Sequence, residues 1–225
     1  MVLNHGAPTF VKICGITRLA DARVAIRAGA NAIGFVFAPS PRRVSAARVR
    51  AISSRLHPAV RRIGVFVDDP PGRVLAVAGE AGLDGVQLQG IESVDHLRAL
   101  RAAAPHLFIL KVIRMGGPQS LALGARMRAE ALADAVMVDT KDPADPTRPS
   151  ETISLGDLGE EDHCGIDRLV LAGGLTPGNV GALVREMRPW GVDVSTGVES
   201  APGRKDADKV RAFVRAVREA ETEIV

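Results

Sequence analysis

Short apolar runs alternate along the chain with longer amphipathic stretches. The runs are rich in β-branched residues and predict strands, whereas the stretches between them place apolar residues three or four positions apart, as in a helix that buries one face. The predicted strands cover residues 10–14, 32–37, 62–67, 85–89, 108–113, 135–140, 168–173 and 192–197, and the predicted helices cover 19–28, 45–56, 72–81, 93–104, 119–130, 177–187 and 206–220.

This alternation of strand and helix predicts an α/β protein with a parallel sheet. Eight such units can close into a (β/α)8 barrel, or TIM barrel, whereas an open doubly wound sheet usually has five or six strands. The length of 225 residues is near the roughly 250 residues of one such barrel, so we expect residues 1–225 to form a single domain. The proline-rich, polar segment 141–152 predicts a long loop after the sixth strand, of a kind that often serves as a lid.

The composition excludes several classes of protein. The content of 46% apolar and 24% charged residues is that of an ordinary globular domain, and no apolar run approaches the roughly 18 residues of a membrane span. The first ten residues lack a targeting pattern, which favours a cytoplasmic location. The two cysteines, Cys14 and Cys164, lie in an apolar strand and an acidic segment respectively, so we expect reduced thiols and no disulfide.

Charge and histidine spacing argue against nucleic-acid and metal sites. The net charge is only +3, and 3% aromatic residues with no tyrosine provide few groups that could stack on bases. The five histidines show no metal-ligand spacing, and no glycine-rich nucleotide motif is present. We therefore predict no metal, no cofactor and no nucleic-acid partner.

Two glycine-containing loops suggest a phosphate site. Active sites of (β/α)8 barrels form where the strands end, and phosphate frequently binds after strands seven and eight. Gly173 and Gly174 end the seventh run, and Ser195, Thr196 and Gly197 end the eighth. Either loop alone is equally well explained as a plain strand-to-helix turn. Two such loops in consecutive units favour phosphate binding.

Cys14 and Asp139 are the candidate base and acid. Cys14 ends the first strand, and Lys12 lies two residues earlier on the same strand face, where its ammonium would favour the thiolate. Asp139 ends the sixth strand after three apolar residues. The alternatives are a small buried thiol and a carboxylate that caps a turn. Together the two groups suit a proton-transfer isomerisation without a cofactor.

Arg42 and Arg43 follow the second strand. An arginine there could hold a carboxylate through two hydrogen bonds, although a pair of arginines is more often simply exposed.

At these positions the sequence resembles phosphoribosylanthranilate isomerase, over nearly the whole chain and in the same order. The matching motifs are VKICGIT, AGANAIGFVF, PSPRRVS, GVFV, VQL-x-G, VDT, LAGGLTPGNV and VDVSTGVES followed by PGRKD. The resemblance implies an Amadori rearrangement in tryptophan biosynthesis, acting on the small phosphorylated substrate N-(5-phosphoribosyl)anthranilate. It implies that Cys14 removes the C2 proton, that Asp139 protonates the ring oxygen, and that Arg43 holds the anthranilate carboxylate. It also implies that the backbone around Gly173, Gly174, Ser195, Thr196 and Gly197 holds the phosphate. We expect Lys12 and Gln89 to be among the substrate-binding residues as well.

The chain departs from the family pattern at two places. Gln89 stands where the family usually has a histidine after the fourth strand, and glutamine can form hydrogen bonds but cannot carry a proton. Residues 142–158 lack the family's glycine-rich motif, and their prolines predict a stiffer loop.

Other functions remain open at this point. The sister Amadori isomerase of histidine biosynthesis uses a carboxylate where this chain has Cys14. A relative that acts on another sugar phosphate, such as a thiamine-phosphate synthase or a metal-dependent epimerase, is a broader alternative. A barrel that only binds a phosphorylated ligand would need neither Cys14 nor Asp139. The chain is expected to be a monomer or a homodimer, away from membranes.

Overall fold

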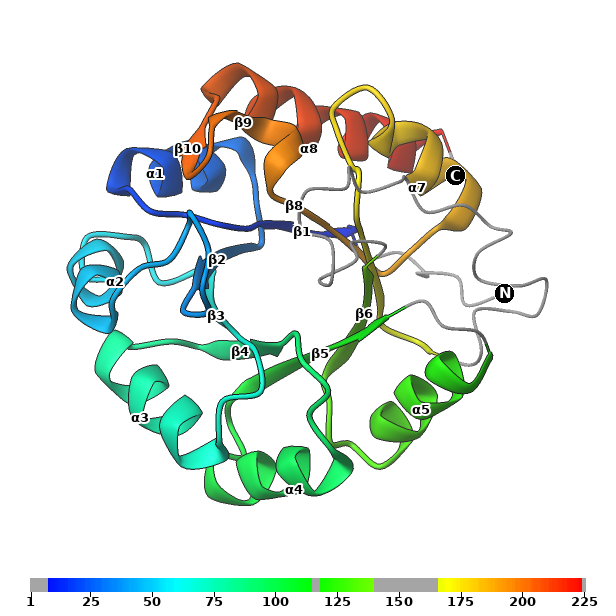
Figure 1. Ribbon diagram of the computed structural model, residues 1–225. Helices are drawn as coiled ribbons and strands as arrows, with labels where there is room; N and C mark the ends of the chain where they lie inside the picture. The colour runs from blue at the N-terminus through cyan, green and yellow to red at the C-terminus, as the bar shows by residue number, and fades with distance from the viewer. Residues whose placement is uncertain (1–7, 115–117, 140–165, 224–225) are drawn as a thin grey trace.

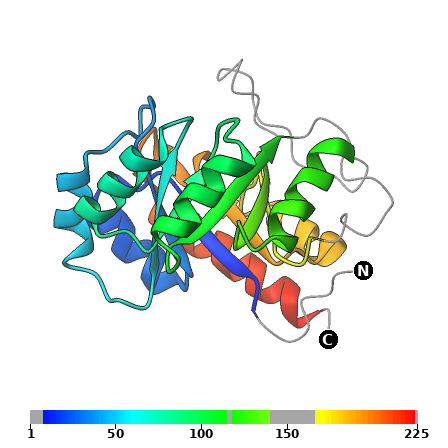
Figure 2. The same cartoon turned by 90° about the horizontal axis from the view of Figure 1, so that it is seen from below.

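Eight parallel strands close into a barrel surrounded by helices (Figure 1). The computed structural model describes residues 8–114, 118–139 and 166–223. Each strand pairs with its neighbours in chain order, and β1 pairs with β8 to complete the ring. Figure 2 turns the barrel on its side and shows the helices packed around the strands. The predicted (β/α)8 barrel is confirmed. Its strands are β1 Phe10–Ile13, β2 Ala32–Val36, β3 Arg61–Phe66, β4 Gly85–Leu88, β5 Phe108–Arg114, β6 Ala135–Asp139, β7 Leu169–Ala172 and β8 Gly191–Val194.

The helices form the outer layer, and several begin at a side chain that caps them. Ser45, Ser93 and Asp206 each accept a hydrogen bond from a backbone N–H of the first turn that has no partner within the helix. Gly29 ends the first helix in the left-handed conformation with φ 97°. The helices are α1 Leu19–Ala28, α2 Ala46–Ser53, α3 Pro71–Ala81, α4 Val94–Ala103, α5 Pro118–Ala129, α7 Val180–Met187 and α8 Ala207–Thr222.

Three predicted boundaries lie three residues from the observed ones: the predicted helix 45–56 ends at Ser53, and the other two lie in the last two units. The predicted strand 192–197 ends at Val194, because the backbone turns at Ser195 and enters a short 3-10 helix, η2 Thr196–Val198. A hairpin of β9 Glu199–Ala201 and β10 Arg204–Lys205 follows, which the sequence did not suggest. The predicted helix 177–187 begins only at Val180, since the preceding residues form a turn.

Buried side chains form two apolar layers, one inside the barrel and one between the strands and the helices. Within β1, Phe10 belongs to the inner layer and Val11 and Ile13 to the outer. Successive side chains of a strand point to opposite faces, and both faces are covered here, which explains the nearly continuous apolar strands. The remaining members of the inner layer are Ala32, Ile63, Phe108, Leu110, Val112, Ala135, Met137, Val170 and Ala172.

Aromatic rings close the end of the barrel where the strands begin. Phe10 stacks on Trp190 with ring centroids 4.7 Å apart and on Phe108 at 6.4 Å. The Arg61 guanidinium lies 4.3 Å from the centre of the Phe108 ring, and that of Arg168 lies 5.7 Å from Trp190, both at distances typical of cation–π contacts. Polar side chains lie at the opposite end of the barrel, where the strands finish.

The proline-rich segment 141–152 lies outside the described residues, so the long loop predicted there stays a prediction. Within the described part of the chain, no helix has both the length and the apolar character needed to cross a membrane.

We predict that Phe10→Ala lowers the free energy of unfolding by about 3–5 kcal/mol, because it leaves a cavity between two stacked rings. Urea denaturation measures the change. Val67→Ala is the control: Val67 is 40% exposed, and this substitution should cost less than about 0.5 kcal/mol. Equal losses in the two variants would show that the aromatic cluster does not hold the barrel closed.

Candidate active site

Polar side chains collect inside the barrel at the ends of four strands. Alternation fixes their direction: Val192 and Val194 face the helices, so Asp193 between them faces inward. The same alternation directs Lys12 and Cys14 inward from the end of β1, Gln87 and Gln89 from β4, and Asp139 from β6. Because all strands are parallel, these groups lie at one end of one barrel.

Lys12 and Asp193 form a buried ion pair across β1 and β8. They are direct neighbours in the strand register, and Nζ of Lys12 lies 2.8 Å from Oδ1 of Asp193. The Lys12 side chain is fully buried and that of Asp193 is 10% exposed. Burial acts to lower the pKa of Lys12, but the Asp193 carboxylate and Cys14 outweigh it, and the pKa is raised. Lys12 is therefore an ammonium held inside the barrel.

Cys14 lies beside this ammonium in a space that Gly34 leaves open. A Cβ atom at Gly34 on β2 would come within 2.8 Å of the Cys14 sulfur and 3.1 Å of the Lys12 nitrogen. Burial raises the pKa of the Cys14 thiol, and the charges of Lys12 and Lys205 offset this only in part. The sequence-based expectation that Lys12 favours the thiolate is right in direction, but burial outweighs it in the free protein. The resting group is a thiol.

Asp139 is held by a chain of side-chain amides from β4. Nε2 of Gln89 donates to Oδ2 of Asp139 over 3.0 Å, and Nε2 of Gln87 donates to Oε1 of Gln89 over 2.6 Å. Gln89 thus fixes the direction of the carboxyl group. It has no proton to transfer at neutral pH, so its contribution is orientation.

The two glycine-containing loops lie against each other. Gly173 and Gly174 have φ values of 99° and 59°, a region that favours glycine. A Cβ atom at Gly197 would lie 1.9 Å from the backbone oxygen of Leu175, so only glycine allows the loops after β7 and β8 to approach this closely. Asn179 braces the first loop, since its side chain accepts from Thr176 N and donates to Gly174 O.

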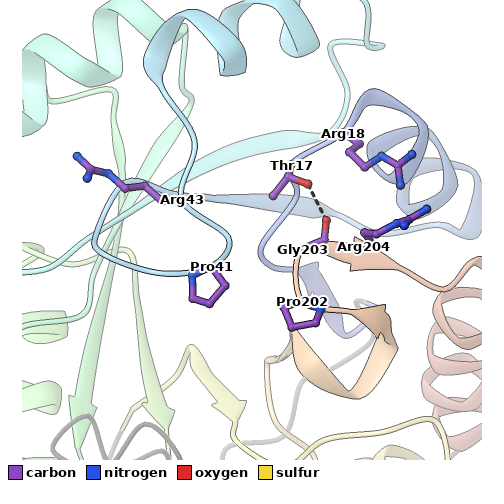
Figure 3. A pocket seen from close by; sticks show the side chains of 7 residues that line it. All are labelled: Thr17, Arg18, Pro41, Arg43, Pro202, Gly203 and Arg204. Carbon is purple, nitrogen blue, oxygen red and sulfur yellow. Dashed lines mark hydrogen bonds between the residues drawn. The ribbon is translucent and has the colours of Figure 1, made fainter.

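The two adjacent arginines have different surroundings. Arg42 holds Glu199 through two hydrogen bonds, Nε to Oε1 at 2.8 Å and a terminal nitrogen to Oε2 at 2.6 Å. Arg43 is exposed, and its guanidinium has no hydrogen-bond or ion-pair partner within the described residues. In Figure 3 its side chain extends away from the hydrogen bond between Thr17 and Gly203. Arg42 therefore already binds a carboxylate of the protein, that of Glu199, whereas Arg43 binds none among the described residues.

The structure thus gathers the sequence-predicted residues at one end of the barrel but also shows residues that sequence reasoning missed. Asp193, Gly34, Glu199, Lys205 and Asn179 were not singled out. An aspartate between two apolar residues of β8 was a usable signal, because such a charge needs a buried partner. Among the described residues, no group of three or more metal-ligating side chains of His, Cys, Asp or Glu exists.

Comparison with known proteins gives consistent matches. Residues 11–216 match the family described as N-(5'-phosphoribosyl)anthranilate (PRA) isomerase. The enzyme of that name from Desulforudis audaxviator is 43% identical over 214 residues, which is 94% of this chain and 99% of the relative. The crystal structure of phosphoribosyl anthranilate isomerase from Thermotoga maritima superposes with a TM-score of 0.83 at 35% identity, covering 94% of this chain and 99% of that one. A structure of such an isomerase with reduced 1-(o-carboxyphenylamino)-1-deoxyribulose 5-phosphate gives 0.75 at 35% identity, with the same coverage.

We predict that thiolate absorbance of Cys14, measured in a Cys164→Ser background, appears only above the ordinary thiol pKa of about 8.5. Lys12→Met removes the cation that most lowers the Cys14 pKa, so this pKa should rise further. Lys111→Met is the matched control: Lys111 is a second buried lysine, and it lies 2.6 Å from Glu92. This control should leave the thiol titration unchanged. A thiolate at neutral pH, or a downward shift in Lys12→Met, would contradict the analysis of the site.

Proposed function

Because the chain belongs to the family of N-(5'-phosphoribosyl)anthranilate isomerases, we propose that Cys14 and Asp139 are the base and the acid of its reaction. The reaction is the Amadori rearrangement of N-(5-phospho-β-D-ribosyl)anthranilate to 1-(2-carboxyphenylamino)-1-deoxy-D-ribulose 5-phosphate, a step of tryptophan biosynthesis. One observation carries the assignment: Cys14 directly follows β1 and Asp139 ends β6 of one parallel barrel, and both side chains face its interior at the same end.

The proposed chemistry begins at the ring oxygen of the sugar. Asp139 donates a proton to this oxygen, the bond from C1 to the ring oxygen breaks, and the nitrogen lone pair forms an iminium at C1. The Cys14 thiol gives up its proton to solvent, and the resulting thiolate takes the C2 proton. The electrons of that C–H bond form a C1–C2 double bond as nitrogen regains its lone pair. Protonation at C1 and loss of the C2 hydroxyl proton give the ketose. Every bond made and broken is within the substrate, apart from proton transfers.

The ammonium of Lys12 supports this base without being consumed. It interacts with both Asp193 and the Cys14 sulfur, so it lowers the cost of a thiolate at a buried position. The sequence predicted two roles for Lys12, substrate binding and support of the Cys14 thiolate. Its contacts with Asp193 and Cys14 favour the second role.

The two charged groups of the substrate are proposed to bind at two places at the same end of the barrel, the loop after β2 and the loops after β7 and β8. Arg43 holds the anthranilate carboxylate, for which its exposed guanidinium, without an ion-pair partner among the described residues, is suited. Backbone N–H groups of the loops after β7 and β8 hold the phosphate, at Gly173, Gly174, Ser195, Thr196 and Gly197. The left-handed glycines and the close contact between the two loops support this arrangement.

Three further properties are proposed, concerning the oligomeric state, the location and the domain organisation. A structure of monomers generated from the dimeric isomerase of Thermotoga maritima exists, so this chain is proposed to be a monomer or a homodimer, which light scattering would decide. A cytoplasmic location fits an enzyme of amino-acid biosynthesis. The single domain over residues 1–225 fits one closed barrel.

Cys14→Ser and Asp139→Asn should each lower kcat/KM by about 10²–10⁴-fold, the usual contribution of a general acid or base. Loss of anthranilate fluorescence on incubation with phosphoribosylanthranilate measures the rate. Cys164→Ser and Asp84→Asn are the controls. Cys164 is the second cysteine, and Asp84 precedes β4 at the opposite end of the barrel.

The outcomes separate the role assignment from the function. Full turnover by Cys14→Ser and Asp139→Asn would refute the assignment and leave the function intact. Absence of turnover by the parent protein would favour a barrel that only binds a phosphorylated ligand or that acts on another sugar phosphate.

Gln89→Leu should lower kcat about tenfold, because Asp139 loses the hydrogen bond that orients it. Gln89→His retains a donor at this position and should keep most of the activity. Steady-state kinetics of the two variants check the effect. If both variants lose activity equally, the amide does more than orient the acid.

A further inference from the structure

A buried carboxylate, Glu199, connects the loop after β2 to the loop after β8. Its side chain is 5% exposed and lies at the start of β9. It accepts two hydrogen bonds from Arg42, one from Lys205 at 2.9 Å and one from the backbone N–H of Gly203 at 3.2 Å. Sequence analysis gave no role to Glu199, and the proton transfers proposed above do not use it.

The first connection runs through Arg42 to the loop that carries Arg43. The planar fork of the guanidinium fits the carboxylate with two bonds, which fixes orientation as well as distance. The backbone of the neighbouring Arg43 is fixed too: it bridges to Val36 of β2, and its N–H donates to Ser40 O over 3.0 Å. Arg42 also packs closely over Gly15, where a Cβ atom would lie 2.6 Å from its Cδ. Arg42 is therefore the buried anchor of the loop that presents Arg43.

The second connection runs through Lys205 to the phosphate loop. Nζ of Lys205 lies 2.9 Å from Oε1 of Glu199 and donates to the backbone oxygen of Ser195 over 3.0 Å. Ser195 is the residue at which the chain leaves β8 and enters η2. The Lys205 side chain is 1% exposed, so its ammonium has little water to replace these partners.

Glu199 is the anion that allows both cations to be buried. Burial acts to raise the pKa of Glu199, but Arg42 and Lys205 outweigh it and hold the pKa below the ordinary range. Neutralising Glu199 would leave two cations together in a buried position, where like charges repel. The loop after β2 and the loop after β8 would then lose the carboxylate that holds both of them.

We propose that Glu199 is a positioning residue that holds the carboxylate-binding Arg43 and the phosphate-binding Ser195 loop at a fixed separation. The inference rests on the proposed function, because it assumes that these loops bind the two charged groups of one substrate. Those groups lie at opposite ends of the molecule, so the distance between the two loops determines whether both can be bound at once. Figure 3 shows the loops of Pro41 and Pro202 facing each other at this junction.

Two ligands separate the two connections. One is reduced 1-(o-carboxyphenylamino)-1-deoxyribulose 5-phosphate, and the other is the same compound without its carboxyl group. Calorimetry gives the Kd of each ligand for the full chain. Arg42→Gln should raise the Kd of the carboxylated ligand about tenfold and change the Kd of the other ligand by less than about twofold. Arg43→Gln should have the same two effects, because it removes the proposed contact with the ligand's carboxylate. Lys205→Gln should raise both values by the same factor. Glu199→Gln should raise both values, and that of the carboxylated ligand more.

Two further variants test whether the effect is merely structural. Arg42→Lys keeps the charge but loses the fork, so it should restore part of the selective affinity. Arg62→Gln removes a similar two-bond pair with Asp84 at the opposite end of the barrel and should change neither Kd. Thermal unfolding of each variant shows that it is folded.

An equal effect of Arg42→Gln on both ligands, or no effect on either, would overturn the inference. So would failure of the parent protein to bind either ligand. The proposed function fails separately, if the parent binds both ligands but does not convert phosphoribosylanthranilate.

Discussion

The ion pair between Lys12 and Asp193 determines what the polar end of this barrel can do. A lone charge inside a barrel of apolar side chains would be strongly unfavourable, and breaking such a pair typically costs about 3–5 kcal/mol. The pair joins β1 to β8 at the place where the ring closes. It puts an ammonium beside the Cys14 sulfur, and it fixes the strand that leads into the candidate phosphate loop. The candidate base and the candidate phosphate site therefore depend on one contact.

The two ends of the barrel serve different purposes. Stacked aromatic rings and apolar side chains fill the end where the strands begin, and they supply stability. At the other end, the inner positions of the same strands are lysine, cysteine, glutamine and aspartate. Each buried charge there has a partner: Asp193 for Lys12, and Glu199 for both Arg42 and Lys205. Because those partners belong to the protein itself, the candidate site residues are held in place without a bound ligand.

Much of the fold and part of the site could be predicted from the sequence. Short β-branched apolar runs and the helical spacing between them reveal eight strands and their helices, and the polar residues that end the predicted strands include Cys14 and Asp139. The partners of buried charges could not be predicted, because Glu199 meets Arg42 only once the barrel has closed. The same holds for the two arginines: adjacent residues of one type give no signal of which forms an ion pair, and Arg42 meets Glu199 only in the folded chain. The thiol pKa was also beyond reach, since burial dominates it.

The central claim is that Cys14 and Asp139 act on the same small molecule from two strands of one barrel. A crystal structure of this protein with reduced 1-(o-carboxyphenylamino)-1-deoxyribulose 5-phosphate measures this directly. The account predicts the Cys14 sulfur about 3–3.5 Å from C2 of the ligand, and an Asp139 carboxyl oxygen about 2.6–3.2 Å from the hydroxyl oxygen derived from the furanose ring. A ligand that contacts only one of the two groups, or neither, would contradict it.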